Sequence, residues 1–410
     1  MQTHLSPEFA NTPQGREAEA ILRRCVHCGF CTATCPTYQL LGDELDGPRG
    51  RIYLIKQVLE GERPTRRTQL HLDRCLTCRN CESTCPSGVE YGRLVDIGRR
   101  IVEEKVPREP GEQAVRWALK EGLNSSLFAP AMKLGQALRP LLPGVLRQKV
   151  TAPRGAGRWP AREHPRKVLL LAGCVQPAMA PNINSATARV LDAAGIQTVV
   201  APEAGCCGAV KFHLNDQAGG LAQMRANIDA WWPWVERGQV EAIVMNASGC
   251  GVTVAEYGHH LQHDAAYADK ARRIGELTRD LSQLLPELVP SLRGKVRPPP
   301  GLLAFHPPCS LQHGLKLRGG VERHLGELGF QVRVAPAESH LCCGSAGTYS
   351  VLQPKIAGQL RDRKLAALGE LAPQAIISAN MGCITHLQGG TATPVRHWIE
   401  ALDDALAAAA

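Results

Sequence analysis

Two runs of cysteine near the start of the chain have a spacing that suits a metal cluster. Cysteines stand at positions 25, 28 and 31 with a Cys-Pro pair at 35 and 36, and the same spacing returns fifty residues later at 75, 78, 81, 85 and 86. Three cysteines spaced C-x2-C-x2-C on a tight loop can hold three irons of one [4Fe–4S] cube, while the cysteine before the proline reaches the other cube. The doubled run therefore predicts two interlocked clusters.

This cross-ligation divides the eight cysteines into two predicted ligand sets. The first set is Cys25, Cys28, Cys31 and Cys85, and the second is Cys75, Cys78, Cys81 and Cys35. A pair of structural zinc sites is the alternative. Zinc usually takes one tetrahedral set of four ligands from paired C-x2-C knuckles, and it requires neither a third cysteine two residues on nor a Cys-Pro. The spacing favours iron–sulfur clusters.

The other eight cysteines repeat on a much longer period. They are Cys174, Cys206, Cys207 and Cys250, followed by Cys309, Cys342, Cys343 and Cys383. The matching positions lie 133 to 136 residues apart, and Gly195 maps onto Gly329 at a similar step. These offsets indicate an internal duplication in which each copy carries one Cys-Cys-Gly triplet.

Each copy also repeats an order of strands and helices. Short apolar runs at 168–172, 198–201 and 242–245 predict strands in the first copy, and 302–305, 331–334 and 375–377 predict them in the second. Helical patterns separate them, so a parallel sheet with right-handed crossovers is expected. The cysteines follow the strands and should converge beyond their carboxyl ends, where open α/β sheets bind ligands.

We expect a metal or redox site in each copy, with a cluster favoured over a reversible disulfide. The alternative is that these cysteines are buried small hydrophobic residues, although their repetition at fixed positions in loops argues against it. Glycine after each pair lets the backbone approach a large inorganic core closely. Four histidines near the cysteines of the second copy offer a replacement ligand: His306, His313, His340 and His386.

Length and composition indicate the fold class, the number of domains and the redox compartment. The chain has 410 residues, which exceeds one core, and an α+β multidomain fold is expected. The predicted domains are a helical two-cluster ferredoxin-type domain at 1–105, a helical and basic linker region at 106–166, and Cys-Cys-Gly repeats at 167–295 and 296–410. All sixteen cysteines belong to the two doubled patterns, which leaves none for a disulfide framework and predicts a reducing compartment.

Charge and hydropathy narrow the choice of partners. The net charge is +9, and much of the excess lies between residues 144 and 167. This segment is most simply a solvated linker, and the alternative is attraction to anionic lipid or an acidic subunit. No pattern of nucleic-acid binding is evident. We expect no secretory signal within residues 1–20 and no membrane span, because no stretch approaches about 18 apolar residues.

The motifs together resemble the iron–sulfur subunits of flavin-dependent hydroxyacid dehydrogenases, and most closely those of bacterial glycolate oxidases. The similarity runs nearly end to end. The motifs that carry it are Cys25-Val-His-Cys-Gly-Phe-Cys-Thr-Ala-Thr-Cys-Pro-Thr-Tyr, Gly42-Asp-Glu-Leu-Asp-Gly-Pro-Arg-Gly-Arg-Ile-Tyr, Glu203-Ala-Gly-Cys-Cys-Gly-Ala, Leu341-Cys-Cys-Gly-Ser-Ala-Gly-Thr-Tyr and Val395-Arg-His-Trp-Ile-Glu.

The resemblance implies a subunit that carries electrons during oxidation of glycolate to glyoxylate. Flavoprotein subunits would hold FAD and the substrate, and the acceptor would be a quinone or another membrane carrier. The chain agrees with this division, because it contains no G-x-G-x-x-G after a strand that could hold a dinucleotide. It would be cytoplasmic and peripheral on the inner membrane. Arg24, Arg74 and Arg79 are expected to be cationic neighbours of the clusters, and the alternative is that they are ordinary surface charge.

Other members of this wider group remain as alternatives. The repeats also resemble the catalytic subunit of heterodisulfide reductases, in which each repeat ends in C-x2-C. Here Ala247 and Asn380 stand three residues before Cys250 and Cys383, so each repeat offers four cysteines rather than five. A lactate or glycerol 3-phosphate dehydrogenase subunit remains open as well, because the substrate site would lie in another polypeptide.

Overall fold

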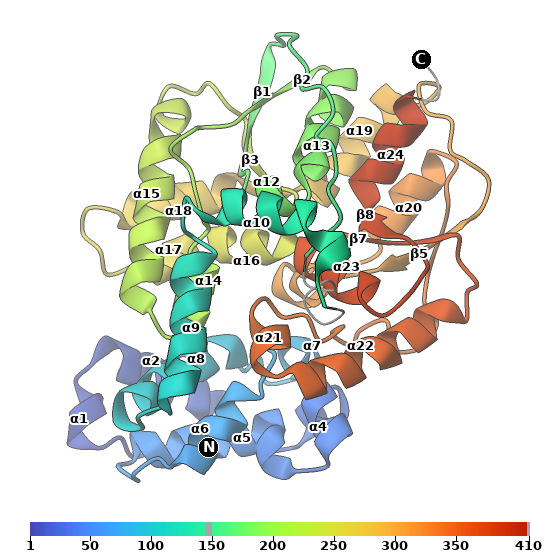
Figure 1. Ribbon diagram of the computed structural model, residues 1–410. Helices are drawn as coiled ribbons and strands as arrows, with labels where there is room; N and C mark the ends of the chain where they lie inside the picture. The colour runs from blue at the N-terminus through green and yellow to red at the C-terminus, as the bar shows by residue number, and fades with distance from the viewer. Residues whose placement is uncertain (144–149, 408–410) are drawn as a thin grey trace.

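The fold is described from a computed structural model of residues 1–143 and 150–407. An N-terminal module of short helices lies along one side of two α/β repeats, which stand next to each other above it in Figure 1. No helix among these residues is long and apolar enough to cross a membrane. The α+β architecture with a duplicated α/β part agrees with the sequence prediction, while the division at residues 105, 166 and 295 stays a prediction.

The N-terminal module consists of helices α1 to α8. Its core lies between α2, α5 and α8, where Leu22, Ile55 and Leu94 are buried in one cluster. The cysteine runs fill the gaps between these helices. The elements are α1 (Pro7–Ala10), α2 (Pro13–Arg24), α3 (Phe30–Ala33), α4 (Pro36–Leu41), η1 (Glu44–Asp46), α5 (Pro48–Leu59), α6 (Arg66–Asp73), α7 (Asn80–Thr84) and α8 (Tyr91–Lys105).

Two helices and a basic segment connect this module to the repeats. Helix α9 (Pro110–Gly122) rises from the module towards the first repeat in Figure 1, and α10 (Phe128–Ala137) and η2 (Arg139–Leu141) follow. Of the predicted basic linker, Arg147 and Lys149 lie outside the described residues. Further along, Arg166 forms ion pairs with Glu241 and Glu287 at 2.7 and 2.8 Å.

The first repeat is a four-stranded parallel sheet in the order β2-β1-β3-β4. Both faces of the sheet are covered, since Val168 and Leu170 belong to one core cluster and Leu169 and Leu171 to another. Its elements are β1 (Arg166–Leu170), α12 (Gln176–Met179), α13 (Pro181–Ala193), β2 (Ile196–Val199), α14 (Ala209–His213), α15 (Gln217–Glu236), β3 (Ala242–Met245), α16 (Ser248–Ala255), α17 (Tyr257–His260), α18 (Ala268–Leu277), β4 (Thr278–Asp280), η3 (Leu281–Leu284) and α19 (Leu285–Leu292).

The second repeat forms a parallel sheet with the equivalent order β6-β5-β7-β8. It shares a core cluster with the first repeat, and Ser248 donates a backbone hydrogen bond to Ala379 across the junction. Its elements are β5 (Leu302–His306), η4 (Ser310–Gly314), α20 (Gly320–Glu327), β6 (Gln331–Val334), α21 (Tyr349–Leu352), α22 (Pro354–Gly369), β7 (Ala375–Ser378), α23 (Met381–Gln388), β8 (Val395–His397) and α24 (Trp398–Ala407).

The predicted strands agree with six of the eight that the described residues form. The remaining two, β4 and β8, are only three residues long and contain charged side chains, so they lack the apolar run that marks a buried strand. Each lies at the edge of its sheet beside the last predicted strand. The interpretation of the strands at 242–245 and 375–377 as the last of each repeat was therefore wrong.

Candidate iron–sulfur sites

The two cysteine loops of the N-terminal module have the same backbone shape. His27 and Gly29 adopt left-handed conformations in the first loop, and Thr77 and Arg79 occupy the equivalent positions in the second. A β-branched residue such as Thr77 rarely adopts a positive φ, and strain of this kind collects at functional sites. The turns bend the chain around the cysteines, and the amide of Thr77 donates to the sulfur of Cys75 at 3.3 Å.

The first loop is brought together with the last cysteine of the second run. Burial raises the pKa of Cys31 to about 11, and the negative charges of Cys25, Cys85 and Cys28 add to this shift. Those four residues are the first predicted ligand set. Cys28 is exposed and Cys25 is buried, so this set reaches the surface of the module on one side.

The second loop meets Cys35 in the same way. Burial raises the pKa of Cys81, and the charges of Cys78, Cys75 and Cys35 act in the same direction. This set lies deeper than the first, at the junction with the second repeat. Cys78 packs with Cys309 against a cluster of apolar residues that includes Cys342. The structure thus groups all eight cysteines as the cross-ligation predicts, while their role as ligands stays a prediction.

The buried cations beside the second set are different from the predicted ones. Arg24, Arg74 and Arg79 pair with the carboxylates of Glu90, Asp46 and Glu256. Arg51 also pairs with Asp46, but it is only 1% exposed and interacts electrostatically with Cys75 and Cys35. Arg99 donates to the carbonyl of Cys75 at 2.6 Å. Sequence reasoning missed both because they lie on α5 and α8, outside the two cysteine runs, and only packing brings them close to the cysteines.

The four cysteines of the first repeat form one continuous group. The thiol of Cys206 raises the pKa of Cys174, and the thiols of Cys206 and Cys250 raise the pKa of Cys207, so the four side chains lie next to one another. The thiol of Cys174 lowers the pKa of Cys206 and has its own pKa raised by the same contact. The side chain of Asn227 donates to the carbonyl of Cys206 at 2.8 Å, which fixes the loop from below.

The second repeat brings its cysteines together in the same order. The sulfur atoms of Cys309 and Cys342 are 3.7 Å apart, and those of Cys343 and Cys383 lie within 4.8 Å of each other. Both groups follow the carboxyl ends of the strands. Gly344 has a φ of 89°, and a Cβ there would lie 2.6 Å from the carbonyl oxygen of Ala357. Only glycine permits this close packing of the Cys-Cys loop on α22.

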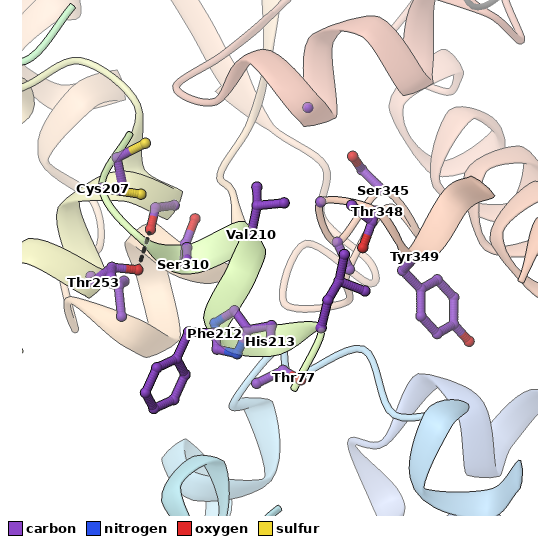
Figure 2. Close-up of a pocket in the computed structure, with 18 of the residues that line it drawn as sticks. Thr77, Cys207, Val210, Phe212, His213, Thr253, Ser310, Ser345, Thr348 and Tyr349 are labelled. Carbon is purple, nitrogen blue, oxygen red and sulfur yellow. Dashed lines mark hydrogen bonds between the residues drawn. The ribbon is translucent and has the colours of Figure 1, made fainter. Parts of the chain in front are cut away.

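A single large cavity connects these groups. It has a volume of about 850 Å³, and its lining includes cysteines of both repeats and of the second loop. Figure 2 shows Cys207 on one side, Ser345, Thr348 and Tyr349 on the other, and Thr77 of the N-terminal module below. Sites of this volume hold small-molecule ligands or cofactors. The converging thiols fit the ligation of iron–sulfur clusters, which are held mainly by cysteine.

Comparisons with known proteins agree with the cysteine pattern. A family model described as a 4Fe-4S dicluster domain matches residues 21–89, and one described as a cysteine-rich domain matches 168–255 and 303–388. The glycolate oxidase iron-sulfur subunit of Escherichia coli (strain K12) is 56% identical over 99% of both chains. This chain belongs to the glycolate oxidase iron–sulfur subunit family.

More distant relatives mark the wider group. The probable glycolate oxidase iron-sulfur subunit of Bacillus subtilis (strain 168) is 29% identical over 93% of this chain and 92% of its own. Lactate utilization protein A of Bacillus pumilus (strain SAFR-032) is 24% identical over 54% of this chain and 91% of its own. The family assignment confirms the resemblance that the motifs indicate.

Proposed function

We propose that this chain carries electrons in a complex that oxidises glycolate to glyoxylate, from a flavoprotein subunit to a quinone-type acceptor. The observation that supports this most is the placement of the cysteines. One set reaches the surface, the next lies at the junction with the second repeat, and Cys309 and Cys342 continue from there. An iron–sulfur cluster, when bound, accepts and releases one electron at a time. The chain's part is to hold such groups in a fixed order.

The surface around the first cysteine loop is the proposed point at which electrons enter this chain. Val26 and Phe30 are 68% and 60% exposed on either side of the exposed Cys28, and the nearby Tyr53 is 45% exposed. Exposed apolar side chains that gather in one place commonly mark a contact with another protein. We propose that the flavoprotein subunit, which holds FAD, binds here.

The residues behind the second set favour electrons arriving there. Arg51 and Arg99 are buried cations next to Cys75, and the amide of Thr77 donates to the Cys75 sulfur. Positive charge and hydrogen bonds at sulfur stabilise the more negative state of a bound group and raise its reduction potential. Further electron transfer would enter the repeats, where the cavity offers space for an acceptor.

The substrate is proposed from the relatives rather than from a site in this chain. The 56% identical relative is named for glycolate oxidase, whereas those named for lactate utilization are 23–26% identical over little more than half of this chain. We therefore favour glycolate over lactate. The four-cysteine repeats, with Ala247 and Asn380 in place of a fifth cysteine, make disulfide reduction the weaker alternative.

A reconstitution experiment tests this function. Flavoprotein subunits combined with this chain should reduce a soluble quinone when glycolate is added, and should do so poorly with lactate. The flavoprotein subunits alone should oxidise glycolate with an artificial dye but leave the quinone oxidised. Equal quinone reduction without this chain would rule out the proposed role.

The entry point can be tested separately. Phe30→Glu places a charge on the exposed apolar surface and should weaken binding of the flavoprotein subunit by at least about 10-fold, while the iron content remains unchanged. Val351→Glu is a matched control, because Val351 is 42% exposed in the second repeat. If both variants bind normally, the flavoprotein contacts another surface.

We also propose that the chain lies peripherally on the cytoplasmic face of the inner membrane. Leu127, Leu134 and Leu141 of the α10 region are 72%, 62% and 82% exposed. Residues 122–162 contain seven Lys or Arg and no Asp or Glu. Exposed apolar side chains next to cations suit a surface of anionic lipid.

Sedimentation with lipid vesicles tests this placement. The chain should bind vesicles that contain phosphatidylglycerol, with an affinity that falls as salt is added. It should not bind vesicles of neutral phosphatidylcholine. Leu134→Glu should reduce the binding. Equal binding to neutral and anionic vesicles, or none to either, would contradict the proposal.

A further inference from the structure

One histidine of the second repeat is fully buried and has no hydrogen bond at either ring nitrogen among the described residues. His313 contacts Ser83 and the carbonyl of His340, and the ring of His386 lies 3.1 Å from the Ala357 carbonyl. His340 is partly exposed. By contrast, His306 is 1% exposed, and neither ring nitrogen has a hydrogen-bond partner among the described residues.

A buried imidazole in this state needs a physical explanation. A neutral imidazole carries one N–H donor and one nitrogen with a free lone pair, and both lose their contacts with water on burial. Unsatisfied buried polar groups are uncommon in native proteins and often mark a missing ion. A metal would use the lone pair that the protein leaves unused.

The nearest groups to His306 are suitable metal ligands. A ring nitrogen of His306 and the sulfurs of Cys343 and Cys383 all lie within 4.8 Å of one another. His306 is the last residue of β5, while the two cysteines come from the Cys-Cys-Gly loop and α23. Cys342 and Cys309 extend the group, with 3.7 Å between their sulfur atoms. Thiolates with imidazole are a donor set that iron and zinc both accept.

The first repeat shows that the fold does not need a histidine here. Leu171 stands three residues before Cys174, as His306 stands three residues before Cys309. Leu171 is buried in a core cluster and offers no ligand atom. The histidine is therefore a feature of the second repeat and not of the shared scaffold.

A buried cation accompanies the histidine. Lys364 is 2% exposed, donates to the backbone carbonyl of Glu338 and interacts electrostatically with Cys343 and Cys342. The equivalent residue in the first repeat is the neutral Asn227, since each lies seven residues after the carbonyl that packs on the Cys-Cys-Gly glycine. A buried ammonium beside sulfur suits ligands that carry negative charge.

We infer that the second repeat holds a thiophilic transition metal, as part of an iron–sulfur cluster or as a single zinc ion, and that the imidazole of His306 is one of its ligands. With the four cysteines it gives five donors, where the first repeat has four. His306 takes the place of the fifth cysteine, although it comes from β5 and not from the segment before α23. The inference concerns ligation alone and holds whether or not glycolate is the substrate.

Metal analysis and spectroscopy of the full chain, purified without oxygen, test this ligand. Two ferredoxin-type clusters account for about eight irons per chain. We expect metal beyond this number: additional iron with sulfide indicates a cluster, and about one zinc indicates a single ion. In protein with ¹⁵N-labelled histidine, pulsed magnetic resonance of the reduced form should detect a coupled nitrogen if the metal is iron. X-ray absorption should detect one nitrogen among sulfur neighbours if it is zinc.

Three variants separate ligation from folding. His306→Leu installs the side chain of the first repeat and should remove the nitrogen signal and at least 90% of the additional metal. His306→Cys supplies another donor and should restore the metal without the nitrogen signal. His324→Gln changes a buried histidine on α20, away from the cysteines, and should alter neither.

Two results would overturn the inference. One is a wild-type chain that contains only the eight irons of the N-terminal module. The other is a His306→Leu variant that keeps the additional metal with an unchanged spectrum. Circular dichroism and the spectrum of the N-terminal clusters show whether each variant has folded, and His306→Cys provides the answer if His306→Leu has not.

Discussion

The first and second repeats have the same strand order and carry their cysteines at equivalent positions. The residues that pack next to the cysteines differ. Leu171 and Asn227 in the first repeat correspond to His306 and Lys364 in the second. The first pair is apolar and neutral, and the second offers a lone pair and a positive charge. A duplicated scaffold has thus kept its backbone while its interior chemistry has diverged.

Position relative to the N-terminal module is the other difference between the repeats. Cys309 and Cys342 share an apolar cluster with Cys78. The first repeat meets the same loop through the ion pair of Arg79 with Glu256, at 2.6 Å. The contact through the shared cysteine cluster supports the proposal that electrons from the second cysteine run enter the second repeat.

Replacing one cysteine in each repeat should give the largest effect. Cys343→Ala should lower glycolate-dependent quinone reduction by about 100-fold or more, because it removes a predicted ligand in the repeat whose cysteines contact the Cys78 loop. Cys207→Ala should cost less than about 10-fold. Quinone reduction by the reconstituted complex provides the measurement, with the iron signal of the N-terminal clusters as the control. Equal losses in the two variants would place both repeats on the electron path.

Removing the buried charge should have a smaller effect. Lys364→Met should weaken metal binding in the second repeat by about 10- to 100-fold and, if the metal is an iron–sulfur cluster, lower its reduction potential, since a cation favours the reduced state. Lys364→Arg keeps the charge and is the matched control. Competition with a chelator and a redox titration measure the two effects. An unchanged reduction potential in Lys364→Met would show that the Lys364 charge does not tune the bound group.

Moving the histidine into the first repeat should affect folding. Leu171→His buries an imidazole where the structure supplies no partner, and should destabilise the metal-free chain by about 3 kcal/mol. His306→Leu should stabilise the metal-free chain. Denaturant unfolding after removal of metal measures both. If Leu171→His leaves the stability of the metal-free chain unchanged, the missing hydrogen bonds of His306 are not evidence that it binds a metal.

The last residues of β4 and β8 are both buried and titratable, and their contributions to stability should change in opposite directions with pH. Burial lowers the pKa of His397 to about 3, although its hydrogen bond to the Asn246 carbonyl acts to raise it. An unfolded histidine titrates near 6.5, so the contribution of His397 is complete above that pH and is lost as the pH falls towards 3. Going from pH 8 to pH 5 should cost the second repeat about 2 kcal/mol.

Asp280 occupies the equivalent position in the first repeat. Burial raises its pKa to about 6, against the hydrogen bonds from Ser282. Its stabilising contribution is fully present below the unfolded pKa of 3.8 and is lost as the pH rises through 6. Going from pH 8 to pH 5 should therefore stabilise the first repeat by about 1 kcal/mol. Unfolding at pH 5 and pH 8 of His397→Gln and Asp280→Asn checks the two signs. Identical pH profiles in both variants and the wild type would contradict them.

Much of the architecture could be predicted from the sequence because it repeats itself. The cysteine offsets identify the duplication, and runs such as 242–245 have a strand's length and polarity. The edge strands were missed, since Thr278-Arg279-Asp280 carries two charges in three residues. Their pairing depends on the neighbouring strand and not on their own composition.

The candidate sites were predictable only where ligands form a motif. The doubled runs identify their own cysteines, whereas Arg51, Arg99 and Lys364 lie in ordinary helical patterns and become relevant through packing. Four histidines near the second repeat were equivalent in the sequence. Only burial and hydrogen bonding distinguish His306 from the other three.

The contacts between the N-terminal module and the second repeat have a consequence for the speed of electron transfer. Asn80 donates to the carbonyl of His340, Ser83 contacts His313, and the hydroxyl of Tyr349 donates to the carbonyl of Arg74 at 3.0 Å. These bonds lie on both sides of the Cys78 loop and hold it against Cys309. Carriers that swing between docking positions slow down in a viscous solvent. The proposed electron-transfer step between module and repeat therefore requires no such swing, so added glycerol should leave its rate unchanged.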